Sequence, residues 1–135
     1  MFFFSSPSFD VLACFRVLIL VHLCMDKPKL DVRFYKTDSG TEPVREWLRE
    51  LPAVDRKKIG EDIKTVQYGW PLGMPLVRKM EKGLWEIRIH LQSRIARVLF
   101  TVSGDMIVLL HGFIKKSQAT PKHDLKLAIN RMRST

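Results

Sequence analysis

Three strand-like runs follow one another closely in the second half of the chain. They read LWEIRIHL, RIARVLFTV and MIVLLHGFIKKSQ, and together they extend from Leu84 to Gln118. In the first run, apolar side chains alternate with Glu86, Arg88 and His90, so polar and apolar side chains lie on opposite faces of a strand. The third run starts with apolar residues on both faces, which favours an inner strand. The pattern predicts an antiparallel meander with one polar face.

The segment before this meander is predicted to form one strand, two helices and a loop. Polar and apolar residues alternate in Leu30–Tyr35, which is typical of a strand. Apolar residues recur at helical spacing in Glu42–Leu51 and Val54–Tyr68, and Thr41 is expected to cap the first of these helices. The stretch 69–83, GWPLGMPLVRKMEKG, is rich in glycine and proline and is predicted to be a loop.

A last helix is predicted to open at Pro121. Four of its apolar residues share one face: Leu125, Ala128, Ile129 and Met132. The predicted order of elements is therefore β-α-α-β-β-β-α. Helices that are grouped before a run of strands favour the α+β class over the alternating α/β class.

Composition adds the size and the charge of the protein. With 135 residues and 15.7 kDa, the chain is long enough for one domain with a hydrophobic core. Its formal net charge of +9 is unevenly spread. Residues 1–63 include ten basic and ten acidic residues, whereas residues 64–135 include thirteen basic and four acidic ones. We therefore expect an anionic partner, RNA above all, although charge alone also suits an anionic membrane or an acidic protein.

Residues 1–24 differ in composition from the rest and are predicted to be an atypical apolar extension. Their apolar stretch is short for a membrane span and contains Arg16 and His22, and no basic segment precedes it as in a secretory signal. They are either a short apolar helix or anchor, or upstream sequence included by a start codon placed too early. A third alternative is that they form an added helix that packs on the domain. The domain itself is expected to span residues 25–135.

Both cysteines, Cys14 and Cys24, lie within this extension. The predicted domain therefore has no thiol for a disulfide framework or a cysteine-based zinc site. The sequence also shows no convincing set of metal ligands, no glycine-rich phosphate loop and no nucleophile elbow. We expect a cytoplasmic protein with neither a metal nor a membrane partner.

The polar face of the meander carries the candidate chemistry. If the first two runs pair as a hairpin, Arg97 joins Glu86 and Arg88 on that face. Repeated cations on one face suit the phosphodiester backbone of a nucleic acid. The same alternation would also arise on the solvated side of a half-buried sheet. His111 lies within the third run, where we expect a hydrogen-bonded core residue rather than a catalyst.

Further basic residues are expected to contact RNA phosphates. Two adjacent lysines end the third run, at a strand end where binding residues commonly gather. The alternative interpretation is a solubilising strand terminus. We expect contacts with the RNA backbone from six residues: Lys115, Lys116, Arg94, Lys122, Lys79 and Lys82.

Five segments together carry a family resemblance: FYKTDSG, EPVREWLREL, GLWEIRI, ARVLFTV and VLLHGFIKKSQATP followed by a helix. The chain resembles the RelE/ParE toxin superfamily, and most closely the HigB-type, phage-derived branch of type II toxin–antitoxin systems. The resemblance covers about Leu30 to Arg133, and its most specific part is LLHGFIKKSQATP. It implies a RelE-like α+β fold, in which two N-terminal helices and a C-terminal helix pack on a twisted, mainly antiparallel four-stranded sheet.

The resemblance also implies an activity and partners. Toxins of this kind enter the ribosomal A site and cleave mRNA without a metal or another cofactor, so mRNA on the ribosome and ribosomal RNA are expected partners. A cognate helix-turn-helix antitoxin is expected to hold the toxin inactive. The alternative within the superfamily is a ParE-like inhibitor of DNA gyrase that cleaves nothing. A third hypothesis is an RNA-binding module that coats ribosomal RNA.

The resemblance carries three basic positions over to this chain. Arg88 matches a basic residue on the first strand of the meander, and Arg97 matches the arginine on the next strand. Lys115 or Lys116 matches the basic residue after the third strand.

Metal-free RNA cleavage needs a base for the 2′-OH proton, cations for the phosphorane and an acid for the leaving 5′-oxygen. Arg97 is expected to stabilise the phosphorane, supported by Arg88 and Lys116. The tyrosine that RelE has near the start of its last helix has no match here, and Lys122 or His123 stands in that region. The base and the acid stay open among three residues: His90, Glu86 and His123.

Overall fold

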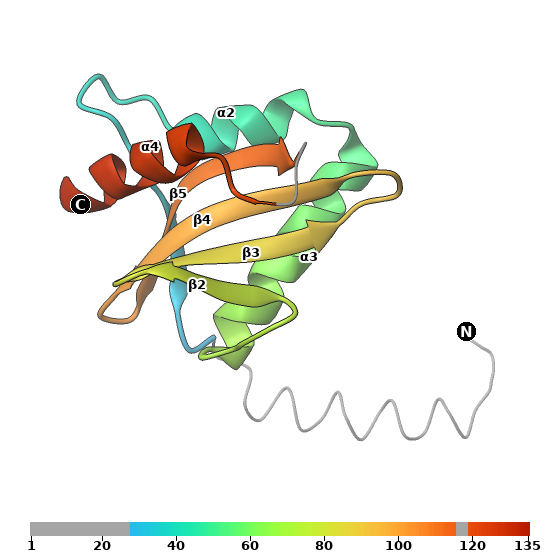
Figure 1. Cartoon of the computed structure of the whole chain (residues 1–135), viewed down its shortest axis with the longest axis horizontal. Helices are drawn as coiled ribbons and strands as arrows, with labels where there is room; N and C mark the ends of the chain where they lie inside the picture. The colour runs from blue at the N-terminus through green and yellow to red at the C-terminus, as the bar shows by residue number, and fades with distance from the viewer. Residues whose placement is uncertain (1–27, 116–118) are drawn as a thin grey trace.

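A five-stranded sheet with three helices makes up the part of the chain that the structure describes (Figure 1). This computed structural model describes residues 28–115 and 119–135. Its elements, in chain order, are β1 (Asp31–Phe34), α2 (Pro43–Glu50), α3 (Ala53–Gly69), β2 (Val77–Glu81), β3 (Leu84–His90), β4 (Ile95–Ser103), β5 (Met106–Lys115) and α4 (Lys122–Arg133). The predicted α+β class is confirmed. The expected extension 1–24, with both cysteines, and Lys116 lie outside the described residues.

The strands lie in the order β1-β5-β4-β3-β2. From β2 to β5 they form an antiparallel meander, and β1 pairs with β5 in parallel. Strand β5 therefore has a neighbour on each side, as its apolar pattern predicted. The predicted hairpin of β3 and β4 is confirmed, with Arg88 opposite Arg97.

Within the described residues the sheet has five strands, so the prediction of four strands is wrong. The reason is that the stretch 69–83, predicted to be a loop, contains β2. The prolines of this stretch end at Pro75, and the chain then pairs with β3. Only Val77 of β2 is buried, and Arg78 and Lys79 are exposed. A short edge strand with charged residues is difficult to distinguish from the loop residues around it.

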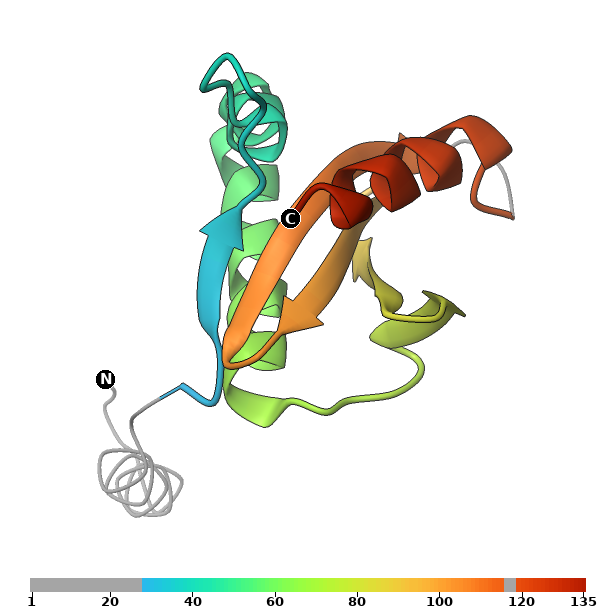
Figure 2. The same ribbon diagram turned by 90° about the vertical axis from the view of Figure 1, so that its left-hand side faces the viewer.

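Helices α2 and α3 cover one face of the sheet, opposite the face that α4 covers (Figures 1 and 2). The predicted apolar stripe of α3 is buried there: Ile59, Ile63 and Val66. It packs on apolar side chains of the strands, which include Ile87, Val98, Phe100 and Leu109. Trp47 of α2 lies so close to Gly112 of β5 that its ring fills the space where a side chain would project.

Prolines mark the helix starts. Helix α2 begins at Pro43, α3 directly follows Pro52, and α4 directly follows Pro121. At these positions the missing N–H costs no helical hydrogen bond. The prediction that Thr41 caps α2 is wrong, because the residue after it takes the N-cap position without a side-chain bond. The backbone N–H of Thr41 instead donates to Oγ1 of Thr37 at 3.1 Å, within a turn.

Helix α4 covers part of the second face. Its apolar side chains share one face, as predicted, and pack on Leu84, Leu99 and Leu110 in a second, smaller core. Its main contacts are with β4 and β5, and Figure 1 shows it over β5 and away from β2. The polar residues of β2 and β3 on this face therefore lie beyond the helix. None of the helices in the described ranges is long and apolar enough to span a membrane.

Candidate functional site

Charged side chains from four strands gather on the face of the sheet that α4 partly covers. Arg78 of β2 lies opposite Glu86 of β3, and Arg88 of β3 lies opposite Arg97 of β4. Paired residues project on the same face of a sheet. Lys115 ends β5, and the charges of Glu86 and the three arginines all act on its ammonium group. We call the four cations, Arg78, Arg88, Arg97 and Lys115, the basic cluster.

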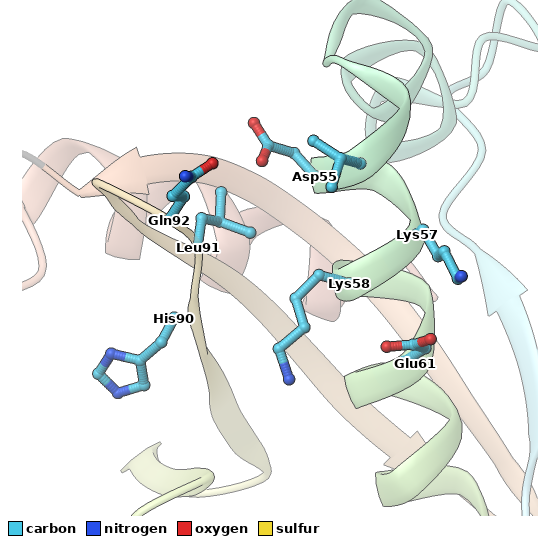
Figure 3. A pocket seen from close by; sticks show the side chains of 8 residues that line it. Asp55, Lys57, Lys58, Glu61, His90, Leu91 and Gln92 are labelled. Atoms are coloured by element: carbon cyan, nitrogen blue, oxygen red, sulfur yellow. The ribbon is translucent and has the colours of Figure 1, made fainter.

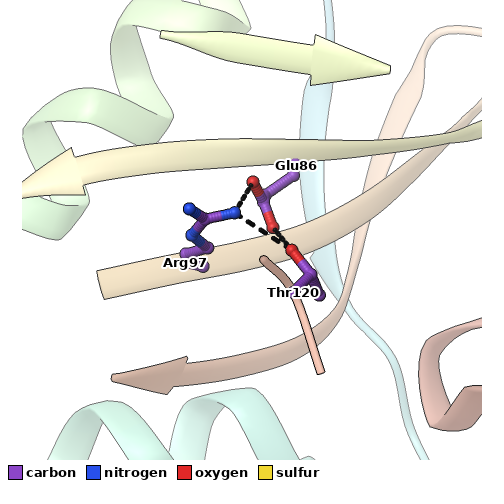
Figure 4. Close-up of polar contacts among 3 residues, drawn as sticks. All are labelled: Glu86, Arg97 and Thr120. Atoms are coloured by element: carbon purple, nitrogen blue, oxygen red, sulfur yellow. Dashed lines mark hydrogen bonds and ion pairs between the residues drawn. The ribbon is translucent and has the colours of Figure 1, made fainter. Parts of the chain in front are cut away.

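Arg97 forms the floor of the basic cluster and is fully buried together with Glu86. Its Nη1 donates to Oε1 of Glu86 at 2.6 Å and to Oγ1 of Thr120 at 3.0 Å. The Thr120 hydroxyl in turn donates to Oε2 of Glu86 at 2.5 Å, which closes the triangle in Figure 4. A buried guanidinium needs this compensation because an unpaired buried charge is strongly destabilising. Glu86 thus neutralises Arg97, and the other three cations carry the net charge of the cluster.

Arg88, directly opposite Arg97, is only partly buried. Its Nε atom is buried, yet no hydrogen-bond partner for it occurs among the described residues. Arg88 also takes no part in the ion pairs found in that portion of the chain. A buried donor without an acceptor is costly, and a bound anion can supply the missing acceptor. Arg88 is therefore well suited to hydrogen-bond an oxyanion such as phosphate.

Lys115 lies among like charges. Its pKa is lowered from the usual 10.5, first by loss of hydration and then by the positive charges of Arg97 and Arg88. Arg78 contributes a smaller lowering, and Glu86 acts in the opposite direction. A bound phosphate would relieve this repulsion. The lowered pKa also makes the ammonium group a better proton donor than an isolated lysine.

A second polar contact on this face joins β5 to α4. Nε2 of His111 lies 2.6 Å from Oδ1 of Asp124, and the two side chains are only 16% and 17% exposed. The imidazole stacks on Phe113 with 5.5 Å between the ring centroids. Burial lowers the pKa of His111 below its usual 6.5 and outweighs the hydrogen bond to Asp124, which acts in the opposite direction. His111 is thus hydrogen-bonded, as predicted, and its partner belongs to α4.

Two predicted site residues lie near α3, at the end of β3 and in the loop that follows it. The register places His90 opposite Ile95, which lies opposite Lys115, so the side chain of His90 projects on the face that carries the basic cluster. His90, exposed at the end of β3, lines a pocket of about 320 Å³ between that strand and the first turns of α3. Figure 3 shows its ring turned away from the helix. Arg94 forms a short ion pair with Asp55 of α3, which ties the loop between β3 and β4 to this helix. The charge of Arg94 is therefore already compensated.

The remaining predicted residues are spread over the molecule. Lys79 lies opposite Trp85 and on the other face of the sheet from Arg78, because successive side chains of a strand alternate. Three further residues are exposed at a turn or at the start of α4: Lys82, Lys122 and His123. Lys116 is outside the described residues.

The sequence analysis did not identify Arg78 or Thr120 as site residues. Arg78 lies in the stretch that was predicted to be a loop, and β2 shows no regular alternation of buried and exposed residues that could have marked it as a strand. Thr120 directly precedes the proline before α4, where a hydroxyl side chain is common. No local signal places it against Glu86, because the two residues are 34 positions apart.

The arrangement is suited to binding an anion. Three cations surround a buried, neutralised ion pair, and within residues 28–115 and 119–135 none of the three has a carboxylate partner and the buried Nε of Arg88 has no acceptor. Residues 28–115 and 119–135 contain no group of three or more histidine, cysteine, aspartate or glutamate side chains that could hold a metal ion.

The protein is a small α+β protein whose helices pack on a mainly antiparallel sheet in a RelE-like arrangement. One side of this sheet carries the basic cluster. The chain belongs to the family of phage-derived Gp49-like proteins (DUF891), whose family model matches residues 46–133. This family belongs to the RelE/ParE-like toxin superfamily, so the expected superfamily is confirmed. No curated protein significantly matches the chain.

Proposed function

We propose that this protein is the toxin of a type II toxin–antitoxin system, in the HigB-type branch, and that it cleaves mRNA on the ribosome without a metal. Membership of the Gp49-like family supports the toxin class. The basic cluster is the observation that carries the proposed activity, because its four cations gather around the carboxylate of Glu86 on the face of the sheet that α4 partly covers. Such a face suits a phosphodiester backbone and the extra negative charge of a phosphorane.

Within this mechanism the members of the cluster have different roles. Arg88 and Lys115 contact the phosphate that is cleaved, and Arg78 extends the contact to a neighbouring phosphate. Arg97 lies beneath them, fully buried and paired with Glu86, so it supports the cluster from below without adding net charge. Proton transfer is assigned to three residues that form no ion pair within the described part of the chain, namely Lys115, His90 and His123. Glu86 is a weaker candidate because Arg97 and Thr120 already occupy both of its oxygens.

The partners follow from the same proposal. Cleavage in the ribosomal A site requires contacts with both mRNA and ribosomal RNA. The same proposal implies a cytoplasmic protein. A cognate helix-turn-helix antitoxin is proposed as the inhibitor.

The test is a primer-extension map of mRNA 5′ ends after brief induction of the wild-type protein and of Arg88→Ala. We expect new ends within translated codons, and about 10²–10³ less cleavage in Arg88→Ala because a cation that faces developing charge is lost. Lys79→Ala is the matched control, since it removes one exposed cation from the other face of the same sheet. Arg97→Ala is not a suitable variant for this test, because it would leave the Glu86 carboxylate buried without its countercharge.

Other outcomes would favour other functions. Full cleavage by Arg88→Ala would contradict the assigned phosphate contact. Growth arrest without new mRNA ends would contradict the proposed nuclease activity. Inhibition of gyrase supercoiling by the purified protein would then support the ParE-like alternative. Binding to ribosomes without cleavage or gyrase inhibition would support an RNA-binding module.

A further inference from the structure

Two arginines of the basic cluster are close enough in the sheet to compete for one carboxylate. Arg88 follows Glu86 by two residues on β3, so their side chains share a face. Arg97 lies opposite Arg88 on β4. Among the charges that act on Lys115, Glu86 is the negative one. The arginine that pairs with Glu86 has its charge compensated, and the other arginine keeps an uncompensated positive charge.

Thr120 provides a physical reason for the observed choice. Its hydroxyl donates to Oε2 of Glu86 and accepts a hydrogen bond from Nη1 of Arg97, so it contacts both members of the ion pair. With Oε1 bound to Arg97 and Oε2 bound to Thr120, each oxygen of the carboxylate has a partner (Figure 4). Arg88 takes part in none of the ion pairs among the described residues, and its Nε is left without an acceptor there.

We propose that Thr120 is a positioning residue that keeps the carboxylate of Glu86 on Arg97 and thereby leaves Arg88 free to bind a phosphate of RNA. This inference rests on the proposed function, because it assumes that Arg88 contacts RNA. Thr120 lies two residues before the start of α4. The hydrogen bonds of Thr120 to the ion pair therefore link the start of α4 to the positive charge that Arg88 presents to the substrate.

The test is the salt dependence of binding to a short single-stranded oligouridine, measured by fluorescence anisotropy. In Thr120→Val the carboxylate loses its second partner and can turn toward Arg88. We expect weaker binding and a slope of log K against log salt that is shallower by about 0.7, which is the loss of one phosphate contact to a single strand. Thr120→Ser keeps the hydroxyl and is expected to retain the wild-type slope.

Thr101→Val is the matched control for a general loss of packing. Thr101 is buried on the sheet, whereas Thr120 is partly buried before α4, and the Thr101 hydroxyl donates to the carbonyl of Gly83 at 2.6 Å, away from the ion pair. This variant removes a comparable hydrogen bond, so we expect a similar change in melting temperature but no change in the salt slope. A wild-type slope in Thr120→Val, or an equal change in both valine variants, would overturn the proposal.

Arg88→Ala separates this inference from the proposed function. If Arg88→Ala keeps the wild-type slope, the RNA contact assigned to Arg88 is wrong. The Nε–Hε NMR signals of Arg88 and Arg97 then test the role of Thr120 without RNA. We expect both signals to move in Thr120→Val and neither to move in Thr101→Val. Unchanged signals in Thr120→Val would refute the role of Thr120 whatever the RNA result.

Discussion

At the scale of single residues, the buried pair of Arg97 and Glu86 dominates the stability of the site. Arg97→Ala leaves a carboxylate buried without its countercharge, so we expect the free energy of unfolding to fall by about 3–5 kcal/mol. The double replacement Arg97→Met/Glu86→Leu removes both charges and should recover most of this loss. Urea denaturation of the three proteins measures the effect. A double variant as unstable as Arg97→Ala would show that the loss does not come from the uncompensated charge.

Gly112 is a second residue whose identity the fold requires. A Cβ atom built there would lie 2.4 Å from the ring of Trp47, which is partly buried between α2 and the sheet. We expect Gly112→Ala to cost about 1–3 kcal/mol, because the ring or the strand must move. Gly60→Ala is the control, since nothing lies within 4 Å of that position on α3 and alanine favours a helix. Thermal melts should show that Gly112→Ala is less stable than the wild type and that Gly60→Ala is more stable.

At the scale of elements, regular patterns were predictable and long-range contacts were not. Helices α3 and α4 and the strands β3, β4 and β5 follow from apolar spacing alone, because each buries a continuous face. Strand β2 was missed because an edge strand buries so little. The alternation along β3 and β4 was enough to place Glu86, Arg88 and Arg97 on one face. It could not show the hydrogen bonds between Thr120 and the buried pair, because Thr120 lies outside the strands.

The attachment of α4 to β5 should depend on pH. Burial lowers the pKa of His111 in the folded protein below the usual 6.5, despite Asp124. Arg131 and His123 of α4 lower it further. The unfolded chain then binds the proton more readily, so stability should fall as the pH drops below about 6.5 and level off below the lowered pKa. This loss should be smaller in His111→Gln.

Unfolding by urea at several values between about pH 8 and 5 tests this dependence. His90→Gln is the control, because it removes an exposed histidine at the end of β3 that lines the pocket beside α3. A His111→Gln protein with the pH profile of the wild type would contradict the assignment.

At the scale of the whole molecule, the position of the positive charge should matter more than its amount. Arg78→Ala/Arg88→Ala/Lys115→Ala removes three cations from the α4 face of the sheet, whereas Lys57→Ala/Lys64→Ala/Lys79→Ala removes three from the α3 side. Both lower the formal net charge from +9 to +6. Long-range attraction to RNA depends mainly on net charge, so both variants should lose association rate similarly at low salt. Only the first loses the phosphate contacts themselves.

Stopped-flow binding to oligouridine and a ribosome cleavage assay separate these two effects. At physiological salt, where the Debye length is about 8 Å, long-range attraction is largely screened. The variant altered on the α3 side should then regain nearly the wild-type affinity and cleavage. The variant altered on the α4 face should stay defective, because lost contacts are not restored by screening. Equal recovery of the two proteins would mean that RNA is attracted by the overall charge and that the α4 face of the sheet is not its binding site.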